Sequence, residues 1–226
     1  MGKVEGALIL TASQCSSGPV GPLVVSPIEQ AEIDAAVYIF LNAFRDNVRL
    51  IYGTEPKPDA MRDVWTFVRD VEPGGFLAAR NGADLIGYAI FTHSIKTLQR
   101  RALREGKLLV WTARALSGRY GIRWFHVGRL LWNKVLFVGG AARFRTAGDA
   151  QLLNIAVSPA ARGKGVAKAL VRAGLRYLAQ RKAPEVRLEV RPDNLAAIAA
   201  YRDNGFVERG RTSDAGGEWL VMTAHP

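Results

Sequence analysis

The chain has 226 residues, of which 49% are hydrophobic and 23% charged, a composition typical of globular proteins, and its net charge is +11. No apolar run approaches the roughly 18 residues of a membrane-spanning helix, and the amino-terminal residues lack a signal-peptide pattern, so we expect a cytoplasmic protein. A single cysteine, Cys15, and three scattered histidines indicate neither an internal disulfide nor a metal site.

The amino-terminal part predicts a tail followed by two helices. Residues 1–22 mix a short apolar patch with Ser, Gly and Pro and show no sustained period, which indicates a flexible tail. Residues 23–226 are expected to form a single domain. A strand is expected near Leu23–Val25, and apolar residues at helical spacing predict a helix from Pro27 to about Phe44. A second helix is expected over Asp59–Val71, between two prolines.

A hairpin follows the second helix. The runs Phe76–Ala79 and Leu85–Thr92 have the composition of strands, and Asn81-Gly82 between them is a strong turn signal. These two strands count as the second and third of the chain, and the next clear strand begins only at Gln151. The intervening segment therefore interrupts the sheet.

Residues 94–147 form a basic insertion between the third and fourth strands. The segment has twelve basic residues and one acid, Glu105, whereas the rest of the chain has nineteen of each. Leu98, Ala102 and Leu109 suggest one imperfect amphipathic helix to about Leu116, and apolar residues from Ile122 to Val135 suggest another. A helical cap with a solvated basic face is one interpretation. The others are a surface for anionic lipid, for an acidic carrier protein or phosphate-bearing substrate, or for nucleic acid.

The carboxyl-terminal part alternates strands and helices. A strand, a helix, a strand and a helix should alternate before a closing antiparallel pair, so the pattern indicates a mixed α/β fold. The crossover helix should place its two flanking strands in parallel. The expected elements are strand Gln151–Val157, helix Lys164–Arg181, strand Val186–Arg191, helix Leu195–Asn204 behind the Asp193-Asn194 cap, and strands Phe206–Arg209 and Trp219–Thr223 around Gly216-Gly217.

The hexapeptide Arg162–Ala167 lies where the first of these strands turns into a helix. The first turn of a helix leaves backbone N–H groups without internal partners, and the helix dipole places partial positive charge there. Glycines at positions 163 and 165 let a phosphate group approach those amides closely. The hexapeptide therefore predicts an anion site, although a glycine pair of this kind is a weak signal alone.

Two motifs around this loop resemble a known family. Leu153–Pro159 followed by Arg162–Ala167 resembles the acyl-CoA signature of the GNAT N-acetyltransferases, in the arginine form of its Gln/Arg-x-x-Gly-x-Gly/Ala loop. Leu188–Asn194, followed by Ala197–Tyr201 and Gly205-Phe206, resembles the branch that acetylates the N-terminal alanine of a ribosomal protein. The resemblance covers residues 150–223 and extends to 23–92, and it implies a mostly antiparallel mixed sheet with one splayed parallel strand pair. It does not extend to the helical basic insertion at 94–147, where the sequence departs from the family pattern.

The resemblance also implies a binding mode for acetyl-CoA, and the cysteine and histidine pattern adds no metal to it. The pyrophosphate would rest on the loop amides, and the pantetheine would run between the strands Gln151–Val157 and Val186–Arg191. An amide near Ile155 or Ala156 would polarise the thioester carbonyl. The residues that the resemblance places at the donor are Ile155, Ala156, Val157, Arg162, Gly163, Lys164, Gly165, Val166, Ala167, Asn194 and Tyr201.

Tyr201 and Glu189 are the candidate catalytic residues. In the matching motif the hydroxyl corresponding to Tyr201 points at the sulfur of coenzyme A, which makes Tyr201 the candidate acid; packing on the short helix is the alternative. In the ribosomal branch the glutamate matching Glu189 takes the proton of the amine. Glu189 could equally be an outward-facing strand residue paired with Arg187 or Arg191, and a water chain would then replace it as the base.

The sequence thus predicts an acetyl-CoA-dependent N-acetyltransferase acting by direct attack of a primary amine, with a small-molecule or peptide acceptor. An amino sugar or a membrane-associated precursor is one candidate acceptor. Alternatives are N-terminal alanine acetylation of a protein and a non-catalytic CoA-binding or membrane-associated scaffold. Among partners of the segment 94–147, anionic lipid at the inner face of the membrane is favoured, because bulky aromatics accompany the basic residues and no nucleic-acid module is recognisable.

Overall fold

The computed structural model describes residues 22–45, 49, 57–121, 147–214 and 217–226. In these ranges seven strands form one sheet in the order β1-β2-β3-β4-β5-β7-β6, and only the β4–β5 pair is parallel. The predicted mixed, mostly antiparallel sheet is therefore confirmed. The strands are β1 (Leu23–Pro27), β2 (Phe76–Asn81), β3 (Asp84–Thr92), β4 (Ala150–Val157), β5 (Val186–Val190), β6 (Val207–Asp214) and β7 (Gly217–Ala224).

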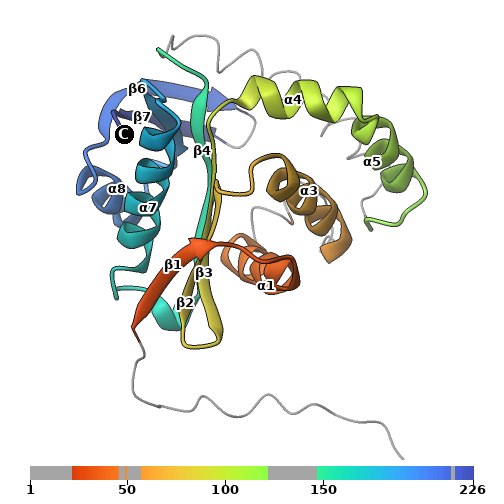
Figure 1. Cartoon of the computed structure of the whole chain (residues 1–226), viewed down its shortest axis with the longest axis horizontal. Helices are drawn as coiled ribbons and strands as arrows, with labels where there is room; N and C mark the ends of the chain where they lie inside the picture. The colour runs from red at the N-terminus through yellow and green to blue at the C-terminus, as the bar shows by residue number, and fades with distance from the viewer. Residues whose placement is uncertain (1–21, 46–48, 50–56, 122–146, 215–216) are drawn as a thin grey trace, which may run out of the picture.

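Helices cover both faces of the sheet (Figure 1). Alternating strand residues point to opposite faces, so Leu77 packs with α7 and α8 while its neighbour Phe76 packs with α1 and α3. Each face thus has its own apolar core. The helices in the described ranges are α1 (Ile33–Ala43), α3 (Pro58–Val71), α4 (Ile95–Arg104), α5 (Lys107–Leu116), α7 (Val166–Gln180) and α8 (Leu195–Arg202).

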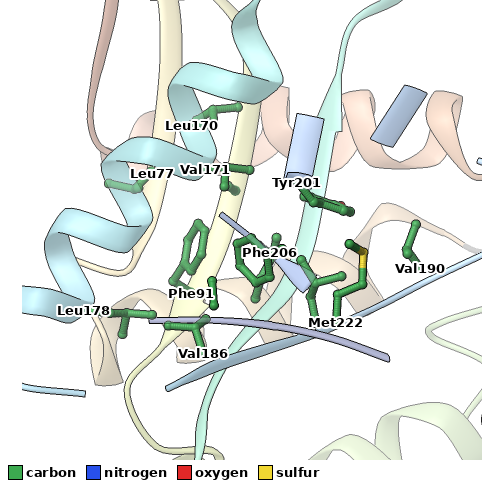
Figure 2. Close-up of a cluster of buried hydrophobic side chains, with 14 of the residues drawn as sticks. Leu77, Phe91, Leu170, Val171, Leu178, Val186, Val190, Tyr201, Phe206 and Met222 are labelled. Atoms are coloured by element: carbon green, nitrogen blue, oxygen red, sulfur yellow. The ribbon is translucent and has the colours of Figure 1, made fainter. Parts of the chain in front are cut away.

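The core beneath α7 joins that helix to the sheet (Figure 2). Leu170, Val171 and Leu178 of α7 are buried against Phe91 of β3. Gly174 makes the approach possible, because a Cβ at this position would lie 2.0 Å from Cε2 of Phe91. The helix therefore lies closer to the sheet than any side chain at position 174 would allow.

Pro27 ends a strand and does not begin a helix, contrary to the sequence prediction. It is the last residue of β1 and pairs with Leu77, and α1 starts only at Ile33, after a short 3-10 helix over Gln30–Glu32. Because β1 is an edge strand, one of its sides has no neighbouring strand. A proline there loses no hydrogen bond of the sheet, since the N–H group that it lacks would point to that unpaired side. The helix Asp59–Val71 and the hairpin of β2 and β3 are confirmed within two residues.

The first helix predicted for the basic insertion is two helices. Gly106, with φ of +65°, separates α4 from α5 in the left-handed conformation that favours glycine. Leu98 and Ala102 of α4 are buried as expected, but the turn at Gly106 leaves Leu109 exposed to solvent. The second predicted helix, from Ile122 to Val135, and residues 1–21 of the predicted tail lie outside the described residues.

A partly buried polar contact fixes α5 to α3. Asp63 of α3 accepts hydrogen bonds from the Arg114 guanidinium and from the Tyr120 hydroxyl. Burial would raise the pKa of Asp63, but these two hydrogen bonds outweigh it and lower the pKa. Trp111 of α5 also packs edge-on against Phe67, with ring centroids 5.5 Å apart. The first part of the insertion is thus held on the face that carries α1 and α3.

Across the described ranges, none of the helices combines the length and the apolarity that crossing a lipid bilayer requires.

Candidate functional site

The parallel strands β4 and β5 separate after two residue pairs. Ala150 pairs with Val186 and Gln151 with Arg187, and the pairing stops there. Beyond this point β4 continues beside β3 and β5 continues beside β7. The carboxyl-terminal halves of the two strands are therefore splayed, as the sequence predicted, and their facing edges do not pair with each other.

A bulge in β4 sets the direction of the backbone at this splay. Asn154 pairs with Ile90 and Leu152 with Phe91, so Leu153 is an extra residue. Leu153 and Asn154 consequently face the same side, where Leu153 packs near the α1 core and Asn154 Oδ1 accepts a 2.5 Å hydrogen bond from Tyr88. The bulge thus shifts the alternation of every later residue of β4.

The amide of Ile155 points into the splay. The Ser158 N–H donates to the Ile86 carbonyl of β3, and a Cβ on Gly87 would lie 3.0 Å from the Ala156 carbonyl oxygen. Since backbone groups alternate in direction along a strand, Ala156 faces β3 while Ile155 and Val157 face away from it. Of the two amides considered for the thioester, the one at Ile155 is suitably directed.

The glycines of the loop adopt a conformation that keeps the approach to α7 open. Gly163 and Gly165 have φ of +75° and +76°, in the left-handed region. A Cβ on either residue would meet no protein atom within 4 Å. The space beside the loop is therefore not filled by the described residues of the protein.

The first turn of α7 has no side-chain cap. Gly165 is its N-cap residue, whereas Ser94 and Asn194 cap the first turns of α4 and α8 through their side chains. The amides of the first turn of α7 thus remain for an external acceptor. The helix begins at Val166, two residues later than predicted, so Lys164 belongs to the loop. Asn194 serves as a helix cap, which was one of its expected roles.

Tyr201 lies on the α7 and α8 side of the sheet (Figure 2). Its side chain is 5% exposed and its ring centroid lies 5.8 Å from that of Phe206. Burial raises the pKa of the Tyr201 hydroxyl to about 12, so the group keeps its proton at neutral pH. Among the described side chains, the Trp219 indole nitrogen is the one fully enclosed polar atom that has no hydrogen-bond partner. The Tyr201 hydroxyl is not such an atom, so it retains some access to its surroundings.

Glu189 lies on the opposite side of the sheet from Tyr201. Val186, Leu188 and Val190 face α7, so Arg187 and Glu189 face the other way. The two side chains form an ion pair in which the Arg187 guanidinium donates to Glu189, and the Arg187 side chain is buried. The observed contact is therefore the one expected if Glu189 pairs with a neighbouring arginine, here Arg187. The two candidate catalytic groups therefore lie on opposite faces of the sheet.

Sequence reasoning missed the contribution of β7 to this second face. The residue pairs that join β5 to β7 run from Val186–Ala224 to Val190–Leu220, so Arg191 and Trp219 are the next to face each other. The Arg191 guanidinium lies over the indole ring of Trp219, 5.2 Å from its centroid. Only the register of two strands distant in sequence brings these groups beside Glu189, and no local motif signals it.

Several solved structures share this fold. SsHAT covers 89% of this chain with a TM-score of 0.64 and 20% identity, and the match spans 96% of SsHAT. The Brucella melitensis ribosomal-protein-alanine N-acetyltransferase gives 0.57 at 18% identity, covering 90% of this chain and 99% of that one. The acetyltransferase yncA of Salmonella typhimurium, solved with acetyl-CoA, gives 0.56 at 14% identity, covering 90% and 93%. At these identities the likeness establishes the fold alone.

Curated relatives match over shorter stretches. The mycothiol acetyltransferase of Nocardioides sp. is 39% identical over 101 residues, which are 44% of this chain and 32% of the relative. The mycothiol acetyltransferase of Saccharomonospora viridis is 37% identical over 113 residues, 47% of this chain and 34% of the relative. The chain thus spans about a third of the length of the curated relatives it matches.

The family model described as the acetyltransferase (GNAT) family matches residues 38–206. This range contains β4 with its bulge, the glycine loop and both candidate catalytic residues, and it amounts to well over half of the chain. The chain therefore belongs to the GNAT acetyltransferase family.

Proposed function

We propose that this protein transfers the acetyl group of acetyl-CoA to a primary amine, with residues 23–226 acting as one domain that carries 94–147 as an insertion. The observation that carries this proposal is the uncapped first turn of α7, preceded by two left-handed glycines, at the carboxyl end of a strand splayed from its parallel neighbour. Acetyl-CoA would supply the activated acyl group and a thiol leaving group.

The donor contacts follow from the directions of the backbone groups. The loop residues Arg162 to Ala167 would hold the pyrophosphate through their amides, and the outward edge of β4 would pair with the pantetheine in the manner of an extra strand. The N–H of Ile155 would donate to the thioester oxygen as negative charge develops on it. Asn194 keeps the start of α8 in place beside this path.

Two proton transfers complete the reaction. The amine nitrogen bonds to the acetyl carbon as the bond from that carbon to sulfur breaks, so the nitrogen must lose a proton and the sulfur must gain one. Tyr201 would donate toward the departing sulfur from the α7 side. Glu189, or a water held by it, would accept the amine proton on the other face. Because Arg187 pairs with Glu189, a water relay is a stronger candidate than direct transfer.

A small-molecule amine is the acceptor that we favour, in keeping with the relatives named mycothiol acetyltransferase. An amino sugar or a membrane-associated precursor falls within this class. The Arg191 and Trp219 pair beside Glu189 offers a cationic and aromatic surface for such a molecule. N-terminal alanine acetylation is the second candidate, and it rests on the resemblance of residues 188–206 to the ribosomal-protein branch.

A steady-state assay of coenzyme A release tests the proposal. With acetyl-CoA and a panel of small amines and alanine-starting peptides, we expect release that depends on one class of amine and matches the acetylated product in amount. Activity confined to the peptides would select the second candidate. Tight binding of coenzyme A, with no transfer of label from acetyl-CoA to any amine of a cell extract, would instead establish the scaffold alternative. That result would contradict the proposal.

Substituting alanine at Gly163 and Gly165 together is expected to raise the KM for acetyl-CoA about tenfold or more. Each alanine would hold a strained left-handed conformation, at about 1–2 kcal/mol, and would place a methyl group in the space left for the phosphates. Steady-state kinetics at varied acetyl-CoA measures the effect. Gly106→Ala is the matched control, since Gly106 has φ of +65° and equally open surroundings but lies between α4 and α5. An equal rise in KM in the control would contradict a local role.

A further inference from the structure

The polarity of α5 is inverted with respect to an ordinary surface helix. Its two charged residues, Lys107 and Arg114, lie near the side that carries Trp111, which packs on α3. Arg114 is held by Asp63, and Lys107 lies 3.8 Å from the Glu105 carboxylate. A surface helix normally turns its charged residues to solvent and its apolar residues to the core. Here the charged side chains are engaged with the protein, and the solvent side carries none.

An apolar stripe occupies the solvent side of α5. Leu109, Ala113 and Leu116 follow one another at helical spacing, about half a turn of the helix away from Trp111. Leu109 is 78% exposed and Leu116 66% exposed, and Leu103 at the end of α4 is 63% exposed. Leu109, Ala113 and Leu116 form what we term the α5 stripe. Exposed large apolar side chains that gather on one surface mark an interaction site.

Basic residues predominate in the segment that carries the α5 stripe. Residues 95–121 contain seven basic residues and a single acid, Glu105. Of the seven, Lys96, Arg101, Lys107 and Arg114 have carboxylate partners, and the charge of Arg119 acts on Asp63. Arg100 and Arg104 are exposed on α4. Apolar residues flanked by exposed arginines are the pattern of helices that lie in the headgroup region of an anionic bilayer.

We propose that the α5 stripe inserts into the headgroup region of an anionic membrane, with Arg100 and Arg104 of α4 contacting the lipid phosphates. The Asp63 contacts and the Trp111–Phe67 packing hold α5 on α3, so the membrane would bind a preformed surface. This inference is independent of the proposed acetyl transfer, because it uses none of the residues of the donor or catalytic site.

The charge and the apolar residues of this surface favour an anionic membrane over a second copy of the chain and over nucleic acid. A second copy of the chain would bring the two arginine-rich surfaces together, and like charges across an interface oppose association. Nucleic acid would account for the arginines but would leave the leucines of the α5 stripe exposed. A bilayer with anionic headgroups satisfies both the apolar residues and the basic residues at once.

Vesicle co-sedimentation of the full chain tests the inference. We expect pelleting with vesicles of phosphatidylcholine and phosphatidylglycerol, little pelleting with phosphatidylcholine alone, and release at high salt. The double substitution Leu109→Ser and Leu116→Ser should weaken binding to the mixed vesicles about tenfold or more. Its control is Leu195→Ser, because Leu195 is 73% exposed on α8, on the other face of the sheet. Arg100→Gln with Arg104→Gln should also weaken binding, whereas Arg172→Gln with Arg176→Gln on α7 should not.

Three outcomes would overturn the proposal. Equal pelleting with neutral and anionic vesicles, or unchanged binding by the double leucine variant, would exclude the α5 stripe as the membrane contact. The double leucine variant could also lose more melting temperature than Leu195→Ser while its vesicle binding stays unchanged. That result would mean that the chain itself covers the α5 stripe. A dimer that the leucine substitutions dissociate would assign the stripe to a second copy.

Discussion

Replacing Tyr201 with phenylalanine is expected to lower kcat about a hundredfold, while KM for acetyl-CoA changes by no more than about twofold. The phenylalanine keeps the contact with Phe206 and fills the same buried space, so only the hydroxyl is lost. Steady-state kinetics gives both constants. Tyr38→Phe is the control, because Tyr38 is 68% exposed on α1 and should leave both constants unchanged.

The pH dependence separates a catalytic hydroxyl from a packing residue. Because burial raises the pKa of Tyr201 to about 12, the hydroxyl stays protonated well into the alkaline range, and any alkaline limb of kcat below that pH must come from another group. Ionisation is less favourable in the folded than in the unfolded protein, so the stability from burial is complete below about pH 10 and is lost toward pH 12. Unchanged kcat in Tyr201→Phe would contradict the proposed role.

Gly174→Ala is expected to lower the free energy of unfolding by about 2–4 kcal/mol, although alanine is the better helix former by about 1 kcal/mol. The added Cβ would lie 2.0 to 2.3 Å from three ring atoms of Phe91, which is completely buried in the core beneath α7 (Figure 2). Either the helix must move away from the sheet or the ring must leave its position. Urea unfolding followed by circular dichroism measures the change.

Two further variants check the cause of this loss. Ala179→Gly, at an exposed position of α7, should cost only about the 1 kcal/mol of helix propensity. Phe91→Leu combined with Gly174→Ala should cost less than the sum of the separate changes, because the smaller side chain relieves the contact. A stabilised Gly174→Ala, or strictly additive effects, would show that α7 does not depend on this close approach.

The glycine loop and its flanking elements were predictable because their signals are local. A strand, a turn with two glycines and a helix occupy consecutive residues, and the boundaries of β4 and α7 agree with the sequence prediction within two residues. The helix break at Gly106 was missed because an isolated glycine within a helical pattern costs only about 1 kcal/mol and does not by itself end a helix. The exposure of Leu109 followed from that break.

The contacts that shape the candidate catalytic site depend on strand register. The Arg187–Glu189 pair could be foreseen as one of two options, but the facing of Arg191 and Trp219 depends on how β5 pairs with β7. The bulge at Leu153 likewise appears only when β3 is set against β4. Asp63 and Arg114 are 51 residues apart, and neither lies in a motif. Such contacts arise from the packing of distant segments, which local propensity does not encode.

Only two residue pairs join β4 to β5, so the sheet is weakly connected at this junction. On one side β1 to β4 form a continuous hydrogen-bonded unit, and on the other β5, β7 and β6 form a second one. Beyond those two pairs, continuity across the seam rests on side chains, chiefly those that α7 packs against both units. A molecule that lies between the strands and bonds to the open edge of β4, as proposed for the pantetheine, would act as an added strand. In that case the substrate would serve as a structural brace, and the stiffness of the molecule would rise and fall with each turnover.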